Sequence, residues 1–298
     1  MNKNWRPETL LPKLRKFTFF IFSFFGLFEF TKNKLTRLLL FLYFGSRDAV
    51  INQFSSIISP LDVSIQNSKG LYLRYKEFLK ILKPNWQSEN EYIRIGSKYD
   101  GGYWITKRVL RKADFLVSGG IESNNDFEYY LARNGIPGIQ IDNSVDRAPK
   151  AHKKLQFIKK TLGISENNIS RYIPINSKNV IIKLDIEGAE YETLKQITDF
   201  SKVICLIVEF HEIYKIVEED FWRSLKELLS KLKLSHDNIC VKANNAGGTF
   251  IIGNQILPKV IEVTFVRKDL LNHSTKKFPE MESLGVNKPS FPPITIYW

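Results

Sequence analysis

Short apolar runs alternate with segments of helical periodicity along the second two thirds of the chain. The runs expected to form strands are 114–118, 139–142, 180–185, 203–210, 239–242 and 260–267. One of them, VICLIVEF at 203–210, is almost continuously apolar, as in a strand buried on both faces. Residues 221–232 instead repeat apolar side chains at helical spacing. This alternation predicts an α/β fold with a doubly wound, Rossmann-like and largely parallel sheet of about six or seven strands.

The first 45 residues are both hydrophobic and basic. Two apolar runs, at 17–30 and 35–44, are separated by the polar sequence TKNK. Neither run reaches the roughly 20 predominantly apolar residues of a membrane-spanning helix without including a charge. We expect this N-terminal hydrophobic helical extension to anchor the chain at a membrane surface; the alternative is a helix pair packed on the domain or on a partner chain. The expected location is the cytoplasm, with the chain peripheral to or anchored at a membrane through its N-terminus.

Three segments are expected along the 298 residues. Residues 1–45 form the membrane anchor or helix pair. Residues 46–90 form a helical connector that includes LYLRYKEFLKIL at 71–82. Residues 91–298 form the α/β domain, which is long enough to bury a sizeable core of its own.

The formal net charge of +13 is unevenly distributed. Residues 1–50 hold nine Lys and Arg against three acids, a net of +6, which leaves +7 for the rest of the chain. No Arg-rich helix, ribonucleoprotein motif or zinc-finger spacing accompanies that remainder, so a nucleic-acid partner is not expected. Cys205 and Cys240 stand in apolar, β-branched runs, where they indicate neither a disulfide framework nor a metal site.

Candidate chemistry follows the ends of the expected strands, because ligands bind at the carboxyl edge of an open parallel sheet. Gly119 and Gly120 follow the first strand and allow the backbone to approach a cofactor closely. Asp142 ends the next strand, 23 residues after Gly119. An acid at about 20 residues' separation can accept hydrogen bonds from both hydroxyls of a ribose. Asn125 and Glu128 have the spacing of a capping box for the intervening helix.

The densest group of acids lies in KLDIEGAEYETL at 183–194. Asp185, Glu187 and Glu190 surround Gly188 where a buried strand passes into a helix. A helix N-terminus stabilises one or two nearby carboxylates. It does not easily explain Asp185, which ends the strand beside the expected cofactor.

Several motifs, which occur in family order across residues 92–298, resemble the FkbM-type family of methyltransferases. KLDIEGAEYETL is similar to the family signature. RIGSKYDGGYWI at 94–105 and SGGIESNNDFE at 118–128 resemble the segments around the first strand in one branch of the family. The run from His236 to the two asparagines at 244–245, followed by ILPKVIEVTF at 256–265, resembles that branch's last strands.

The resemblance implies a seven-stranded methyltransferase-type fold with S-adenosylmethionine as cofactor. The implied reaction is methyl transfer to a hydroxyl, often on a sugar or a secondary metabolite, so we expect a glycan or related small-molecule acceptor. Gly119, Gly120 and Glu122 would line the methionine end of the cofactor, and Asp142 would hold its ribose. Asp185 with Glu187 would face the transferred methyl group.

An alcohol that accepts a methyl group needs alignment and a base that takes its proton. His211 directly follows the strand at 203–210 and is the best base candidate by position and by the usual pKa of histidine. Asp185 is the second candidate, either as the base or, with Glu187, as a ligand for a divalent cation. No other metal site is expected.

Residues outside the strand ends complete the expected site. Arg94, Asp100 and Tyr103 precede the first strand and would cover the acceptor, with His236 as a further contact. Asp100 and the two glycines after it could equally form a hairpin turn.

Two other functions fit the sequence. A nucleotide-sugar-dependent glycosyltransferase also needs an acid for a ribose, and carboxylates for a metal. A non-catalytic module would keep the fold for binding alone. It is suggested by two departures from the family pattern: the glycine loop lacks the family's fuller form, and the segment between residues 160 and 180, where adenine would be recognised, is short and poorly patterned.

Overall fold

The structure, a computed structural model, describes residues 63–66, 69–85, 87, 91–252, 255–271, 285–291, 293, 294 and 296. The hydrophobic and basic segment at 1–45 lies outside these residues, so its anchoring at a membrane stays a prediction. Among the residues described, no helix has the length and apolar character needed to cross a bilayer. The chain divides into two compact units, Met1–Ser68 with Phe250–Ile256, and Lys69–Thr249 with Leu257–Trp298. The expected domain boundaries at residues 45 and 90 stay predictions.

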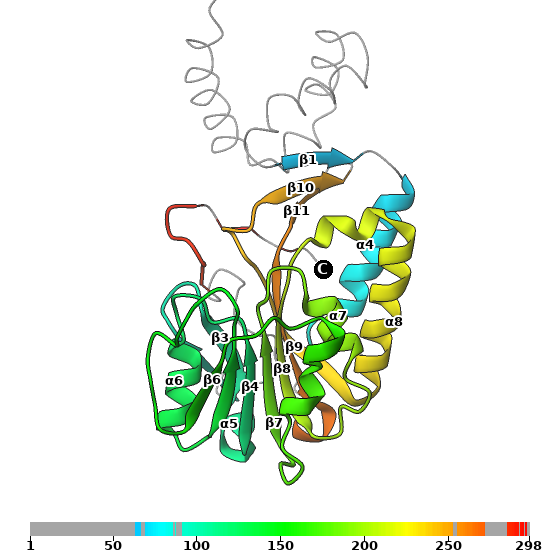
Figure 1. Cartoon of the computed structure of the whole chain (residues 1–298). Helices are drawn as coiled ribbons and strands as arrows, with labels where there is room; N and C mark the ends of the chain where they lie inside the picture. Colours follow the sequence, from blue (N-terminus) through cyan, green and yellow to red (C-terminus); the bar gives the residue numbers. More distant parts are fainter. Residues whose placement is uncertain are drawn as a thin grey trace, which may run out of the picture. The chain divides into compact units, whose positions relative to one another are not determined.

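The second unit is built on a seven-stranded sheet with the order β6-β5-β4-β7-β8-β12-β9 (Figure 1). Its strands are β4 (Phe115–Gly119), β5 (Gly138–Ile141), β6 (Leu155–Ile158), β7 (Val180–Leu184), β8 (Val203–Phe210), β9 (His236–Ala243) and β12 (Ile261–Arg267). Every strand expected from the sequence is present, with small shifts at its ends.

Strand direction and order define the fold class. β4 pairs in parallel with β5 on one side and with β7 on the other, so the chain changes direction across the sheet at β4. β12 runs antiparallel to both of its neighbours, β8 and β9. This arrangement confirms the doubly wound, Rossmann-like sheet of the seven-stranded methyltransferase type.

A hairpin and two helices pack on the sheet in one buried apolar cluster. The hairpin consists of β2 (Tyr92–Gly96) and β3 (Gly102–Thr106), and the helices are α5 (Lys107–Lys112) and α6 (Asp126–Arg133). Phe127 and Leu131 of α6 lie in this cluster with Ile105 of the hairpin and with Ile181 of β7. The cluster therefore fixes the hairpin turn beside the carboxyl ends of the central strands.

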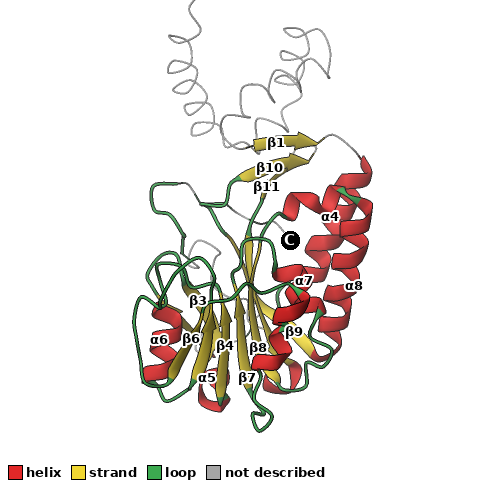
Figure 2. Ribbon diagram, viewed as in Figure 1, coloured by secondary structure: helices red, strands yellow, loops and turns green. Residues whose placement is uncertain are grey.

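Three further helices form a separate group, seen beside the sheet in Figure 2. They are α4 (Lys69–Leu82), α7 (Glu190–Lys195) and α8 (Glu219–Ser235). α8 buries Leu225, Leu229 and Leu232, which stand at helical spacing as expected. Arg74 of α4 donates hydrogen bonds to the carbonyl oxygens of Ile216 and Val217 at 3.0 and 2.9 Å, which fastens α4 to the segment before α8.

Three local features bear on what was expected from the sequence: one strand was not expected, one turn had been left as an alternative, and one expected capping box is absent. β6 was not expected because LQFI is short, lies between lysines and is only partly buried at the sheet edge. Asp100 and the glycines after it do form a hairpin turn, since β2 and β3 pair in antiparallel register. The capping box is absent: Asn125 makes no side-chain cap bond, and Glu128 instead accepts a hydrogen bond from Ser118.

A second, smaller sheet includes residues of the first unit. β1 (Val63–Gln66), β10 (Thr249–Ile252) and β11 (Gln255–Pro258) form three strands in the order β1-β10-β11. β1 is thus a strand within residues 46–90, which were expected to be helical, whereas α4 in the same stretch is a helix as expected.

Candidate functional site

A cavity of about 520 Å³ opens at the carboxyl edge of the large sheet. Its walls come from segments 100–103, 120–124, 183–187, 209–214, 244–247 and 259–260. Three of these segments follow or end β4, β7 and β8, and one is the hairpin turn. The cavity therefore lies at the switch point of the sheet, where ligands bind in doubly wound folds.

The glycine loop after β4 packs directly on the end of β7. Gly120 has a φ of +77°, and a Cβ atom there would lie 1.6 Å from the carbonyl oxygen of Asp185. A Cβ atom on Gly119 would lie 2.6 Å from Cδ1 of Leu162. Gly120 therefore requires glycine, whereas a side chain at Gly119 would have to displace the end of the Leu162 side chain. Gly120 lines the cavity together with Glu122, whereas Gly119 lies behind it.

Asp142 holds the glycine loop from behind. One carboxylate oxygen accepts hydrogen bonds from the backbone N–H groups of Ile121 and Glu122 at 2.7 and 2.8 Å. The other accepts from the N–H and the hydroxyl of Ser144 at 2.7 and 2.6 Å. Burial would raise the pKa of Asp142, but these hydrogen bonds lower it overall. The carboxylate has about four acceptor positions, so its own chain already fills them, and Asp142 does not line the cavity.

Backbone strain is concentrated in the cavity wall. Among the described residues, Glu122, Glu187 and Glu212 are the non-glycine residues with positive φ, at 40°, 54° and 55°. All three are acids that line the cavity, in the segments after β4, β7 and β8. This conformation is unfavourable for residues other than glycine and is often found at functional sites.

A buried Glu–His pair stands beside the acids. Glu190 is fully buried and accepts hydrogen bonds from the N–H groups of Ile186 and Gly188 at 2.9 and 3.0 Å. Its Oε1 lies 2.8 Å from Nδ1 of His211, and Nε2 of that ring lies 3.4 Å from Glu187. Burial would lower the pKa of His211, but the hydrogen bond with Glu190 and the surrounding negative charges raise it to about 9.

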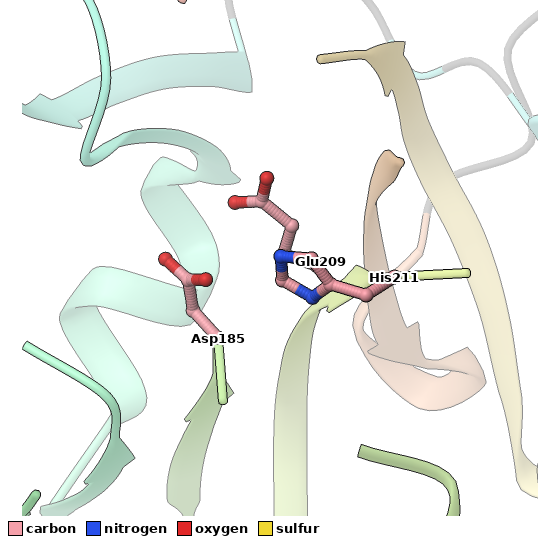
Figure 3. Close-up of side chains that lie close together, drawn as sticks. All are labelled: Asp185, Glu209 and His211. Carbon is pink, nitrogen blue, oxygen red and sulfur yellow. The ribbon is translucent and has the colours of Figure 1, made fainter. Parts of the chain in front are cut away.

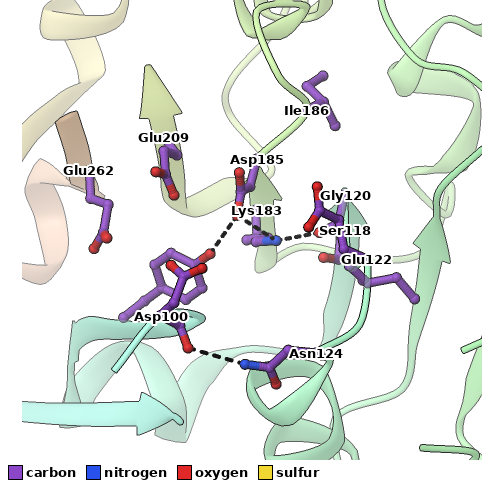
Figure 4. Close-up of polar contacts among 12 residues, drawn as sticks. Asp100, Ser118, Gly120, Glu122, Asn124, Lys183, Asp185, Ile186, Glu209 and Glu262 are labelled. Atoms are coloured by element: carbon purple, nitrogen blue, oxygen red, sulfur yellow. Dashed lines mark hydrogen bonds and ion pairs between the residues drawn. The ribbon is translucent and has the colours of Figure 1, made fainter. Parts of the chain in front are cut away.

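Asp185 is held through one of its two oxygens. The hydroxyl of Tyr103 donates to Oδ2 at 3.0 Å, and the ammonium of Lys183 lies 3.4 Å from the same oxygen. Lys183 also donates to the carbonyl of Gly120, so it joins the glycine loop to the end of β7 (Figure 4). Burial would lower the pKa of Lys183, but the charges of Asp185 and Glu128 raise it.

Two glutamates face each other across the antiparallel strands β8 and β12. Glu209 is paired in register with Glu262, and the two residues are only 3% and 8% exposed. Glu262 lies 2.9 Å from the ammonium of Lys242. From the described residues, Glu209 accepts one hydrogen bond, donated by the amide of Asn244 to its Oε1. Burial, followed by the charges of Asp185 and Glu262, raises the pKa of Glu209 well above its usual range.

These acids and His211 form two groups with the geometry of metal ligands. Asp185, Glu209 and His211 each offer one ligand atom, and the three atoms lie within 4.8 Å of one another. Their side chains turn toward a common point (Figure 3). Asp100, Glu209 and Glu262 form a second group of the same size, which shares Glu209 with the first.

The cavity as a whole is acidic. Burial and the nearby charges of Glu187 and Asp185 raise the pKa of Glu122. A pocket of one charge sign attracts ligands of the opposite sign. Seven carboxylates line the cavity, against Lys183, Lys259 and His211; they belong to Asp100, Glu122, Glu128, Asp185, Glu187, Glu209 and Glu212.

Two of the expected acceptor residues belong to the hairpin, Arg94 to its strand β2 and Asp100 to its turn, with different roles. Arg94 donates to the carbonyl oxygens of Ser97 and Tyr99, the latter at 2.7 Å, and it does not line the cavity. It therefore closes the turn. Asp100 does line the cavity, and its carbonyl oxygen accepts a hydrogen bond from the amide of Asn124 at 3.1 Å. That bond joins the turn to the glycine loop.

His236 is not part of this assembly. Its side chain is fully buried at the start of β9, and Nε2 lies 2.7 Å from the carbonyl oxygen of Val203 at the start of β8. Burial lowers the pKa of His236. The residue thus lies at the amino edge of the sheet, opposite the cavity, and the structure does not bring it to the expected acceptor.

Several side chains of the site escaped the sequence analysis, and Lys183, Glu209, Asn244 and Glu128 are four of them. Two of these four could have been found from the sequence. A single charged residue in an otherwise apolar strand is costly to bury unless it is paired or has a functional role. Lys183 stands alone in VIIKL, and Glu209 stands alone in VICLIVEF. The other two became visible only when the strands were placed side by side.

No protein-family model and no curated protein sequence matches this chain. The resemblance to the FkbM-type family therefore depends on the motifs alone.

Solved structures with a similar sheet include several methyltransferases. A dimethyladenosine transferase from Plasmodium falciparum is 12% identical, with a TM-score of 0.33, over 54% of this chain and 60% of its own. A TehB-like SAM-dependent methyltransferase from Corynebacterium glutamicum is 12% identical, with a TM-score of 0.31, over 54% of this chain and 88% of its own. A magnesium protoporphyrin IX methyltransferase from Synechocystis, with bound SAH, is 10% identical, with a TM-score of 0.31, over 52% and 74%. Similarities this low say nothing about the substrate or reaction of this chain, whose fold class follows from its own strand order.

Proposed function

We propose that this chain is an S-adenosylmethionine-dependent O-methyltransferase that acts on a hydroxyl group of a glycan or a related metabolite. The observation that carries the proposal is the position of the cavity. It opens at the switch point of a methyltransferase-type sheet, against the glycine loop after β4 and the acids after β7.

The donor side of the cavity suits a cofactor with a positive charge. S-adenosylmethionine supplies a methyl group already activated on a sulfonium. The acidic lining favours that cation, and Gly120 lets the loop backbone come close without a side chain in the way. Asp142 accepts hydrogen bonds from the N–H groups of Ile121 and Glu122, which fixes the shape of the loop.

The acceptor side offers groups that can orient a hydroxyl and take its proton. Asp185, Glu187 and His211 lie together at the ends of β7 and β8, and Tyr103 and Glu190 hold the first and the last of them in place. A hydroxyl oxygen placed among them would lose its proton to the carboxylate of Asp185 or Glu187 as the new C–O bond forms and the methyl–sulfur bond breaks. His211, whose pKa is raised to about 9, already carries a proton at neutral pH and would orient the hydroxyl instead.

A labelled-methyl assay on the full-length protein tests the proposal. The protein is incubated with methyl-labelled S-adenosylmethionine and a panel of mono- and oligosaccharides, and transfer of label to the acceptor is measured. We expect Asp185→Asn to lower transfer by about 100-fold or more, in line with the loss of a proton acceptor or an orienting group. The matched control is Glu166→Gln, which removes an exposed acid outside the cavity. Transfer that Asp185→Asn leaves unchanged would refute the assignment.

A non-catalytic binding module is the second candidate, because Asp142 already uses its acceptor positions within the chain. In that case S-adenosylhomocysteine would bind weakly or not at all, and no acceptor would be labelled. The nucleotide-sugar alternative has no observation of its own in its favour, because the order of the seven strands is that of the methyltransferase type.

A further inference from the structure

We propose that Asp185, Glu209 and His211 form a binding site for one divalent first-row transition-metal ion. This set differs from the pair Asp185 and Glu187 expected from the sequence, since it includes the buried Glu209. Cation binding is independent of the proposed methyl transfer and can be measured without cofactor or acceptor.

In each of the three side chains, one polar atom contacts another residue of the chain, and a second polar atom is left to bind an ion. Within the described residues, Tyr103 and Lys183 both contact Oδ2 of Asp185, and no partner contacts its Oδ1. Likewise Asn244 occupies Oε1 of Glu209, and among these residues its Oε2 has no hydrogen-bond or ion-pair partner. One ligand atom of each residue lies within 4.8 Å of the other two, so the three side chains are held close together before any ion arrives.

His211 has the arrangement of a metal-binding histidine. Its Nδ1 lies 2.8 Å from the buried carboxylate of Glu190, which fixes the plane of the ring. Histidines that bind metals usually donate their second ring nitrogen to a carboxylate in this way. With Nδ1 engaged, Nε2 is the nitrogen left for an ion, and Glu187 lies 3.4 Å from it.

Glu209 supplies an independent reason to expect a cation. Its side chain is 97% buried, it lines the cavity, and it stands opposite Glu262 and close to Asp185. Like charges directly opposite each other in a sheet are destabilising, and a buried charge needs compensation. Glu262 has Lys242 at 2.9 Å, whereas Glu209 has no ion pair within 4 Å among the described residues, and the positive charges of Lys183 and His211 act on it only from farther away. An ion between Glu209, Asp185 and His211 would provide that compensation.

The ligand set selects the class of ion. Two carboxylates and one imidazole suit Mn²⁺, Zn²⁺ or Fe²⁺, whereas Mg²⁺ and Ca²⁺ prefer oxygen ligands alone. Ligands bound at about 2.1 Å from one ion lie no more than about 4.2 Å apart, so small side-chain rotations would close the site. Exposed Glu187 and water could complete the coordination.

The role of the ion, unlike its binding, rests on the proposed function. An ion at this place would hold the acceptor oxygen at the end of β7 and lower its pKa. His211 would then serve as a ligand, and Glu187, 71% exposed at the cavity wall, would be the group left to take the proton.

The test is a titration of the full-length protein with MnCl₂. The protein is first treated with a chelator that is then removed, and free Mn²⁺ is followed by electron paramagnetic resonance. We expect one Mn²⁺ per chain, with Mg²⁺ at equal concentration unable to displace it. Glu209→Gln should weaken binding by at least about 10-fold, and Glu190→Gln by about 10- to 100-fold through His211.

The control variant is Glu212→Gln, which removes one negative charge from the same cavity without touching the proposed ligands. It should leave Mn²⁺ affinity within about 2-fold of wild type. Asp185→Asn is a second ligand variant on a partly exposed side chain, in case Glu209→Gln does not fold. No stoichiometric binding, or an equal loss in Glu212→Gln, would overturn the site. Because these readouts need no methyl donor, a failed metal site and a failed methyltransferase proposal can be told apart.

Discussion

Asp142 accepts a hydrogen bond from the backbone N–H of Glu122 at 2.8 Å, and this contact closes the loop that lines the cavity. The carboxylate also binds Ile121 and Ser144, so it organises the segment between two strands. We expect Asp142→Asn to lower the free energy of unfolding by about 1–3 kcal/mol, because an amide cannot satisfy all of these donors. Denaturant unfolding measures the change.

The same interaction predicts a pH dependence. The pKa of Asp142 is lowered in the folded protein, so its contribution to stability is complete above the ordinary aspartate pKa and is lost as pH falls through the lowered value. The stability difference between wild type and Asp142→Asn should be constant between about pH 5 and 8 and shrink below about pH 4. A difference that persists undiminished at low pH would mean that the charge of Asp142 is not what holds the loop.

Gly120→Ala should break the junction between the glycine loop and β7. The new Cβ atom would lie 1.6 Å from the carbonyl oxygen of Asp185, at a φ of +77°. We expect a loss of more than about 3 kcal/mol, measured by denaturant unfolding. Gly285→Ala is a matched control, because its φ is +84° but no atom of the described part of the chain lies within 4 Å of the added Cβ. It should cost only the backbone strain, about 1–2 kcal/mol; equal losses in the two variants would contradict the close packing.

The variant Glu187→Gly distinguishes the backbone strain at this position from the role of its carboxylate in methyl transfer. Glu187 is 71% exposed and has a φ of +54°, which costs about 1–2 kcal/mol for a residue with a side chain. Glycine removes that strain but adds about 0.5–1 kcal/mol of chain entropy, so stability should be unchanged or slightly higher. Methyl transfer should fall, since the carboxylate in the cavity is gone. A clearly less stable variant would show that Glu187 has a structural role instead.

His236→Gln should affect stability alone. Its ring nitrogen lies 2.7 Å from the carbonyl oxygen of Val203, at the amino edge of the sheet. Loss of this buried partner should cost about 1–3 kcal/mol in unfolding experiments. Affinity for S-adenosylhomocysteine, measured in parallel by calorimetry, should not change, and a 10-fold loss would place His236 in the site after all.

Periodic elements were predictable from the sequence, and the contacts among them were not. The strands at 203–210 and 180–184 are long apolar runs, and α8 shows a strong helical repeat, so local pattern was sufficient. β6 and the three-stranded sheet were missed, because short edge strands with polar neighbours resemble loops.

For the candidate site, too, some residues were predictable from the sequence and the contacts among them were not. Asp185, Glu187 and His211, which were chosen by the strand-end rule, line one cavity, and their roles stay predictions. That rule could not show that the carboxylate of Asp142 accepts hydrogen bonds from the glycine loop, because those bonds depend on where two loops meet. Nor could it pair Glu209 with Glu262, since that register is set by an antiparallel strand far along the chain.

The measurement that bears most directly on the central claim is a calorimetric titration of S-adenosylhomocysteine into the full-length protein, with Asp142→Ala as the comparison. We predict saturable binding of one molecule per chain in the micromolar range, weakened by at least about 10-fold in the variant whose glycine loop has lost its anchor. The absence of any binding heat in the wild-type protein, together with no thermal shift from S-adenosylmethionine, would contradict the methyltransferase account.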